Sequence, residues 1–195
     1  MTKKKNIKII NNFLDKKIFK KLQTFLLGAD CPWFYNDKKV YYVKNPVGVE
    51  DAGRSPITPI KGYEINNPQH QFTHSFFSKH TNWSNASINV VPLLDKINPR
   101  IWIKVKGNLS PINSKPLVGG WHCDKDTDGV AWTDTTTSIF FINTNNGYTM
   151  FENGKKIFSV ENTLVTFPNN ILHTGVTQTD TKVKVALNLN YLNEH

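Results

Sequence analysis

The 195-residue chain is long enough for one domain with a full core, and its 38% hydrophobic and 12% aromatic content excludes a disordered tail. No stretch approaches the roughly 18–20 consecutive apolar residues of a membrane-spanning helix, so we expect no membrane partner. The net charge of +9 leaves nucleic acid open as a partner. The hypothesis of a nucleic-acid partner has weak support, because Arg54 and Arg100 are the only arginines. Phosphate recognition favours the planar fork of the arginine side chain. A general lysine bias explains the charge better.

The cellular compartment is predicted from the N-terminus and the cysteines. The basic start of the chain is not followed by the long apolar centre of a secretory signal. Cys31 and Cys123 form no motif with each other, which is typical of reduced thiols in the cytoplasm. We therefore expect a cytoplasmic protein, in the host cytoplasm if the gene belongs to a phage. The sequence does not predict an oligomeric state.

The first half of the chain predicts two helices and a few strands. A short strand over 7–10 precedes Asp15, which can cap a helix whose apolar residues recur at helical spacing up to the stop at Gly28. Strands are expected at 39–43 and 72–77, and a second helix at 84–96, with Pro92 poorly suited to its interior. Between them, 45–71 is rich in Pro, Gly, Asn and Asp and predicts a long loop that helps to choose a substrate.

From Arg100 onward the pattern changes to short strands separated by turns. Residues 101–106 alternate apolar and polar side chains, and strand-like runs follow at 117–123, 136–142, 155–160, 163–167, 171–177 and 182–192. Turns are expected at 143–147, 153–154 and 168–170. The pattern predicts a mainly β fold, a double-stranded β-helix (jelly roll) with two flanking helices from the N-terminal half. We expect a single domain, 1–195, with helices, strands and lid loop in 1–99 and the catalytic core in 100–195.

The strongest chemical signal is His122-Cys123-Asp124, read together with the distant His173. In an extended segment alternate side chains share a face, so His122 and Asp124 would point the same way and Cys123 away from them. Two histidines and one carboxylate form the facial triad that binds Fe(II) and leaves positions open for other ligands. Asp126 and Asp128 are rival carboxylates, although Asp126 is expected beyond the strand end. His70, His74 and His80 have no carboxylate partner at strand spacing, and we assign them no metal role.

The segment from Asn108 to Tyr191 resembles the catalytic core of the 2-oxoglutarate/Fe(II)-dependent dioxygenases, especially the prolyl-4-hydroxylase-like branch. The family's His-x-Asp, distal His and later basic residue match His122 to Asp124, His173, and Lys182 or Lys184. Gly147-Tyr148-Thr149-Met150-Phe151 resembles the family's Gly-Gly-x-Thr-x-Phe turn, with Asn146 in place of the first glycine. Residues 165–168 resemble the strand that leads into the distal histidine.

The resemblance implies an enzyme and its cosubstrate. Fe(II) would be bound by His122, Asp124 and His173, and 2-oxoglutarate would be decarboxylated to succinate and CO2, with ascorbate as reductant. The distal carboxylate of 2-oxoglutarate needs a buried cation. We assign this role to Lys184, because the residues after it resemble the family's run, and keep Lys182 as the alternative. Asn108 is a further candidate donor to the cosubstrate.

The expected activity is hydroxylation of a substrate that the sequence does not identify. The prolyl-hydroxylase resemblance favours a protein or peptide side chain, while oxidation of a nucleic acid or a small molecule stays open. Halogenation is disfavoured, because halogenases of this type lack the carboxylate ligand that Asp124 provides. The alternative to an enzyme is a jelly-roll protein that binds a ligand without catalysing a reaction.

Overall fold

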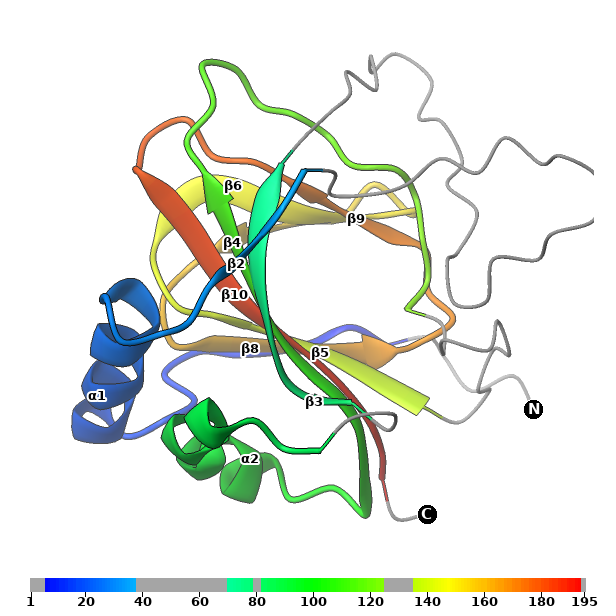
Figure 1. The fold of residues 1–195 in the computed structure, drawn as a ribbon. Coiled ribbons are helices and arrows are strands. Elements are labelled where there is room, and N and C mark those ends of the chain that lie inside the picture. The colour runs from blue at the N-terminus through cyan, green and yellow to red at the C-terminus, as the bar shows by residue number, and fades with distance from the viewer. Residues whose placement is uncertain (1–5, 38–69, 79–81, 125–134, 194–195) are drawn as a thin grey trace, which may run out of the picture.

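The computed structural model describes residues 6–37, 70–78, 82–124 and 135–193, which form two antiparallel sheets and two α-helices (Figure 1). The elements in chain order are β1 (Lys8–Ile10), α1 (Lys16–Leu27), β2 (Phe34–Asn36), β3 (Gln71–Ser78), the 3-10 helix η1 (Asn85–Asn89), α2 (Val91–Ile97), β4 (Ile101–Pro111), β5 (Thr135–Phe141), β6 (Asn145–Phe151), β7 (Lys156–Ser159), β8 (Thr163–Pro168), β9 (His173–Val176) and β10 (Val183–Leu192). The large sheet has the order β1-β8-β5-β10-β4-β3-β2, and the small sheet has the order β7-β6-β9.

The two faces of the large sheet have different partners. Along β10, Val185, Leu187 and Leu189 are completely buried in the core that the sheet shares with α1 and α2. Figure 1 shows both helices on the same side of this sheet, away from β6 and β9. The alternate residues of β10, among them Asn188 and Asn190, therefore lie on the face that is turned away from the helices.

A second core fills part of the space between the sheets. Ile139, Phe141, Val165 and Phe167 of the large sheet pack in one cluster with Phe151 and Ile157 of the small sheet and with Ile171. The rings of Phe151 and Phe167 meet edge to face, with centroids 5.0 Å apart. Next to this apolar cluster, polar side chains of β10 and β4 line the space between the sheets. We call this face of β4 and β10, which is turned away from the helices, the wall.

The first helix follows the sequence prediction closely. The Asp15 side chain accepts hydrogen bonds from the backbone N–H groups of Lys17 (2.8 Å) and Ile18 (3.4 Å), so it caps the helix as expected. Phe19 on the apolar face of α1 packs edge to face on Phe140 of β5, with ring centroids 6.1 Å apart. None of the helices in the described ranges is long and apolar enough to cross a membrane.

Three local predictions were wrong. The predicted helix 84–96 is divided into η1 and α2, because Pro92 occupies the first turn of α2, where its missing N–H costs nothing. The predicted strand 117–123 forms only isolated bridges, Val118 with Val176 and His122 with His173. The predicted turn 143–147 leads directly into β6, which begins at Asn145.

Other predictions cannot be compared with the structure. The expected strand 39–43, nearly all of the 45–71 loop, His80, Asp126 and Asp128 lie outside the described residues. Elsewhere the predicted strands match β1, β3, β4, β5, β7, β8, β9 and β10 to within a few residues, although β4 extends to Pro111. The mainly β jelly roll with two flanking helices is confirmed.

Candidate metal centre

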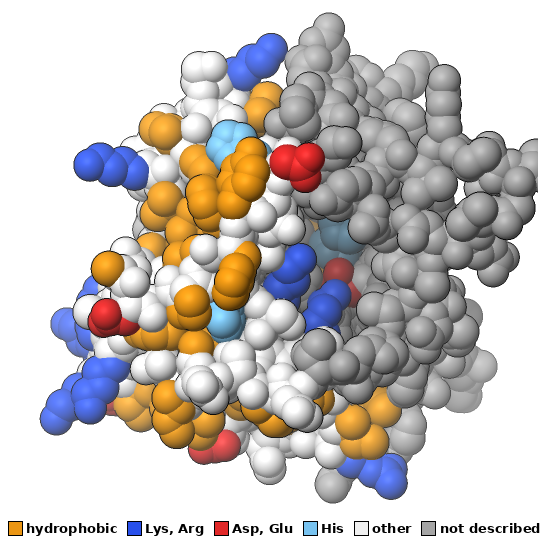
Figure 2. All heavy atoms as spheres, viewed as in Figure 1, with side chains coloured by type: hydrophobic (Ala, Val, Ile, Leu, Met, Phe, Trp, Pro, Cys, Tyr) orange, Lys and Arg blue, Asp and Glu red, His pale blue; other side chains and the backbone are white. Residues whose placement is uncertain are grey.

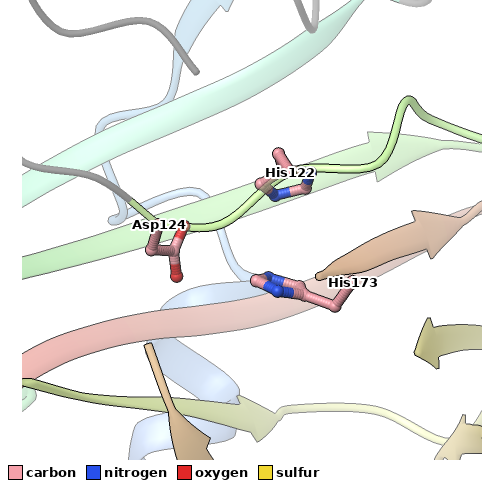
Figure 3. Close-up of side chains that lie close together, drawn as sticks. All are labelled: His122, Asp124 and His173. Carbon is pink, nitrogen blue, oxygen red and sulfur yellow. The ribbon is translucent and has the colours of Figure 1, made fainter. Parts of the chain in front are cut away.

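His122, Asp124 and His173 come together between the two sheets, and one potential ligand atom from each lies within 4.8 Å of the others. His173 is the first residue of β9, and its backbone exchanges two hydrogen bonds with that of His122, at 3.1 and 3.0 Å. Figure 3 shows the three side chains directed toward a common point. The predicted triad is therefore assembled in space, although its members are distant in sequence.

Both imidazole rings are oriented by backbone carbonyl groups. Nδ1 of His122 lies 3.0 Å from the carbonyl oxygen of Gly120, and Nδ1 of His173 lies 3.0 Å from that of Ile171. A carbonyl oxygen can only accept, so each Nδ1 carries the proton and each Nε2 keeps a free lone pair. This arrangement is typical of histidines that bind a metal through Nε2.

The carboxylate of Asp124 is held by three polar side chains of the large sheet. Its Oδ2 atom accepts hydrogen bonds from Asn190 Nδ2 (3.1 Å), Asn188 Nδ2 (3.2 Å) and Thr137 Oγ1 (3.2 Å). Oδ1 has a longer contact with the same amide, 3.4 Å from Asn188 Nδ2. Oδ2 is thus fixed by the protein, whereas Oδ1 is the better placed oxygen for a metal.

Sequence reasoning missed the roles of these three supporting residues. The sequence places Asn188 and Asn190 on the same face of the last strand as Lys184, but it does not reveal their contact with Asp124. That contact depends on how β10 lies relative to the segment that carries Asp124, and alternation within one strand does not contain this information. Thr137 had no signal in the sequence.

The electrostatic environment favours the neutral form of His122 and the ionised form of Asp124. Burial is the main cause that lowers the pKa of His122 to about 4, with a further contribution from His173, so this imidazole is neutral at pH 7. Burial alone would raise the pKa of Asp124, but Lys104, the two histidines and the Asn190 amide outweigh it and hold this pKa below its usual value. Two imidazoles and one carboxylate are a donor set that suits Fe(II), and three such ligands leave coordination positions open.

The predicted cosubstrate residues lie on the same wall, further along the strands. Lys184 is half-buried in β10, and its Nζ donates to the carbonyl oxygens of Val176 (2.8 Å) and Tyr148 (3.4 Å) in the small sheet. Asn108 of β4 is half-buried and pairs with Ala186 of β10. The alternative, Lys182, is exposed and precedes the first residue of β10.

The remaining candidates in the described part of the chain do not join the triad. His74 is buried, and its ring nitrogens lie 2.8 Å from the Pro32 carbonyl oxygen and 2.9 Å from Ser84 Oγ. His70 is exposed, with its ring 5.9 Å from that of Tyr35. Cys123 is half-buried and is not part of the cluster of ligand atoms.

Comparisons with known proteins identify the fold. No model of a protein family and no curated protein matches the sequence. An oxidoreductase of the 2OG-Fe(II) oxygenase family from Burkholderia pseudomallei is similar in structure, with a TM-score of 0.60, 9% identity, and coverage of 97% of this chain and 88% of that chain. A prolyl-4-hydroxylase from Pseudomonas putida gives a TM-score of 0.58 and 10% identity, over 98% and 94% of the two chains.

A third similar structure is a prolyl hydroxylase from Trichoplax adhaerens in complex with a hypoxia inducible factor peptide fragment. It gives a TM-score of 0.54 and 14% identity, and the match covers 97% of this chain and 84% of that chain. At such low identity the likeness concerns the fold and not the substrate. The chain thus has the jelly-roll fold of the prolyl hydroxylases and other 2OG-Fe(II) oxygenases, with a His-Asp-His cluster between its two sheets.

Proposed function

We propose that this protein is an Fe(II)- and 2-oxoglutarate-dependent dioxygenase that hydroxylates its substrate and releases succinate and CO2. One observation carries the proposal: one ring nitrogen from each of two imidazoles and one carboxylate oxygen lie within 4.8 Å of one another between the sheets of an oxygenase-type jelly roll. The alternative without a metal site is a surface pair of His122 and Asp124 with His173 as an unrelated core histidine. It does not account for the two oriented rings or for the three donors that hold Asp124.

In this proposal His122, Asp124 and His173 hold the iron. Bound iron together with 2-oxoglutarate supplies the oxidising chemistry, and the protein supplies position and electrostatics. The carbonyl groups of Gly120 and Ile171 fix the rings so that Nε2 faces the metal position. The amides on β10 keep Asp124 oriented before any ligand arrives.

Lys184 is the residue that we assign to the distal carboxylate of 2-oxoglutarate. Its Nζ reaches the carbonyl oxygen of Val176, and Val176 is three residues from His173 along β9, which corresponds to about 10 Å. An extended five-carbon diacid with one metal–oxygen bond is of similar length. The carbonyl oxygens of Val176 and Tyr148 hold the ammonium group in place on the inner face of the small sheet. Lys182, which is exposed, is the less suitable alternative.

Asn108 is assigned to the cosubstrate as a secondary donor. It is two pairs along the β4–β10 ladder from Ser110, which pairs with Lys184. The position between Lys184 and the metal ligands supports a contact with the middle of the diacid.

For the substrate we propose a protein or peptide side chain. The support is the likeness to the prolyl hydroxylase from Trichoplax adhaerens, which was solved with a peptide fragment. Oxidation of a nucleic acid or a small molecule is the alternative. A non-catalytic binding protein is the alternative outside the enzymes. The succinate-release assay separates it from a dioxygenase.

The test is succinate release from 2-oxoglutarate in the presence of Fe(II) and ascorbate. We expect turnover even without the primary substrate, and its loss in His122→Ala because the triad then has only two ligands. His70→Ala, an exposed histidine, is the matched control. If the protein binds no iron and releases no succinate, the binding-protein alternative replaces the proposal.

The same assay tests the assignment of the cosubstrate lysine. Lys184→Met removes the partner of a buried carboxylate, so we expect KM for 2-oxoglutarate to rise by about tenfold or more. Lys182→Met is the matched control and should change KM by less than about twofold, because exposed charge pairs contribute little. The reverse result would assign the role to Lys182.

A further inference from the structure

Two lysines of β4, Lys104 and Lys106, lie on the same wall as the residues that hold Asp124. In the β4–β10 ladder Lys104 pairs with Asn190, and Lys106 pairs with Asn188. Between the two lysines, Val105 is completely buried on the helix side of the sheet. The lysine side chains therefore project from the opposite face, toward the metal centre.

The two lysines also interact electrostatically with each other and with Asp124. For Lys106, burial and then repulsion by Lys104 lower the pKa, while Asp124 opposes them. Figure 2 shows Lys or Arg side chains beside acidic and histidine side chains near the centre of one face.

Neither ammonium group is paired within the described part of the chain. The structure records no hydrogen bond or ion pair between Lys104 or Lys106 and any described residue, and the two Cα atoms are about 7 Å apart along the strand. Two like charges that are partly withdrawn from water are unfavourable without an anion. Asp124 cannot balance both of them together with a divalent ion.

The same wall holds a second sign of an incomplete site. Asn190 is 4% exposed, and its Oδ1 atom is buried without a hydrogen-bond partner among the described residues, as is Oδ1 of Asn188. Their amide nitrogens are committed to Asp124, so the two oxygens cannot be satisfied by an amide flip without losing those bonds. A ligand that also brings a donor group would satisfy these acceptors.

We propose that Lys104 and Lys106 form a subsite that binds a carboxylate of the molecule to be oxidised, such as an acidic side chain next to the target position. The inference rests on the proposed function and narrows its substrate to an acidic one. The subsite is separate from the 2-oxoglutarate anchor, because Lys184 pairs with Ser110, four residues from Lys106 and about 13 Å along β4.

A carboxylate fits this subsite better than a phosphate. Phosphate sites typically use the arginine fork, helix N-termini or turns rich in backbone N–H groups. Here the cations are two lysines within a strand whose backbone groups are committed to the sheet ladders. The unsatisfied amide oxygens match an amino-acid residue, which offers a backbone N–H beside its carboxylate.

The test is a binding experiment on the full chain with Zn(II) and 2-oxoglutarate bound. The probe is N-acetyl-aspartate amide, with N-acetyl-asparagine amide as the uncharged match, and the readout is the NMR signals of lysines labelled at the ε-carbon. We expect the aspartate probe to shift the Lys104 and Lys106 signals and to bind at least about tenfold more tightly than the asparagine probe. Equal binding of the two probes, or tighter binding of inorganic phosphate, would overturn the proposal.

Variants separate this subsite from the cosubstrate anchor. Lys104→Met/Lys106→Met should weaken the aspartate probe by at least about tenfold, whereas Lys17→Met, an exposed lysine of α1, should leave it unchanged. If the double variant instead loses 2-oxoglutarate while Lys184→Met retains it, these lysines anchor the cosubstrate and the proposal is wrong. Should the double variant not fold, the lysine signals of the unmodified chain still decide.

The experiment also distinguishes the two proposals. Absence of Zn(II) binding would count against the proposed function. The aspartate probe is then titrated into the metal-free chain, where shifts of the Lys104 and Lys106 signals would support an acid-binding subsite and unchanged signals would refute it.

Discussion

At the scale of single residues, the surroundings of His122 and Asp124 set the protonation states of these two side chains. The pKa of His122 is lowered to about 4 and that of Asp124 lies below its usual value, so at neutral pH one is uncharged and the other ionised. The neighbours cause both effects: burial and His173 for the imidazole, and Lys104, the histidines and Asn190 for the carboxylate. Under the proposed function, these two ligands would be in their metal-binding forms before a metal arrives.

The amide of Asn190 is expected to influence metal affinity through Asp124. It donates to Asp124 Oδ2 (3.1 Å) and to Thr137 Oγ1 (3.0 Å), so Asn190→Ala frees the carboxylate to rotate. We predict that the affinity for Mn(II), measured by competition with a chelator, falls about 10- to 100-fold. Asn193→Ala, which removes an exposed bond to Thr136, is the control. Equal affinities of the two variants would show that Asp124 does not depend on this amide.

Because the thiol of Cys31 is buried, we predict that the free energy of unfolding falls at high pH. Burial raises the pKa of this thiol from 9.0 to about 11, so the folded state holds the proton more tightly than the unfolded state. Its contribution to stability is complete below about pH 9 and is lost as the pH rises toward about 11. Urea unfolding across this range should show a decline that is shallower in Cys31→Ala. The same slope in both proteins would contradict the assignment.

At the scale of elements, local signals predicted those structures whose hydrogen bonds are local. The α1 helix is an example, because its cap and its apolar spacing are both contained in one short segment. The β6 strand could not be predicted in this way: Asn145 Oδ1 accepts from the N–H of Gly147 (3.0 Å), a turn-like bond within a strand. The segment 117–123 has strand-like residues, but it meets β9 at isolated bridges only.

The cap of α1 gives a test at this scale. Asp15→Ala leaves the N–H groups of Lys17 and Ile18 without their acceptor, and we predict a loss of about 1 kcal/mol in the free energy of unfolding. Urea denaturation measures it, with Asp30→Ala, an exposed acid beyond the helix, as the control. A loss of the same size in both variants would mean that charge and not capping is responsible.

At the scale of the whole molecule, the site depends on the pairing of strands that are distant in sequence. The motif spacing and the family resemblance predicted the three ligand candidates, and the structure brings them together. The wall around them was not predictable, since the pairing of Lys104 and Lys106 with the β10 asparagines follows from the register of two strands. One core joins the N-terminal helices to the strands of the second half, while the expectation of a single domain over 1–195 stays a prediction.

The most direct test of this account is an anaerobic titration of the protein with Fe(II) in the presence of 2-oxoglutarate, followed by absorption and calorimetry. The account predicts one ion per chain, tighter binding of 2-oxoglutarate once iron is present, and loss of iron binding in His173→Ala. Iron binding that survives this substitution, or 2-oxoglutarate binding that is independent of the metal, would contradict it.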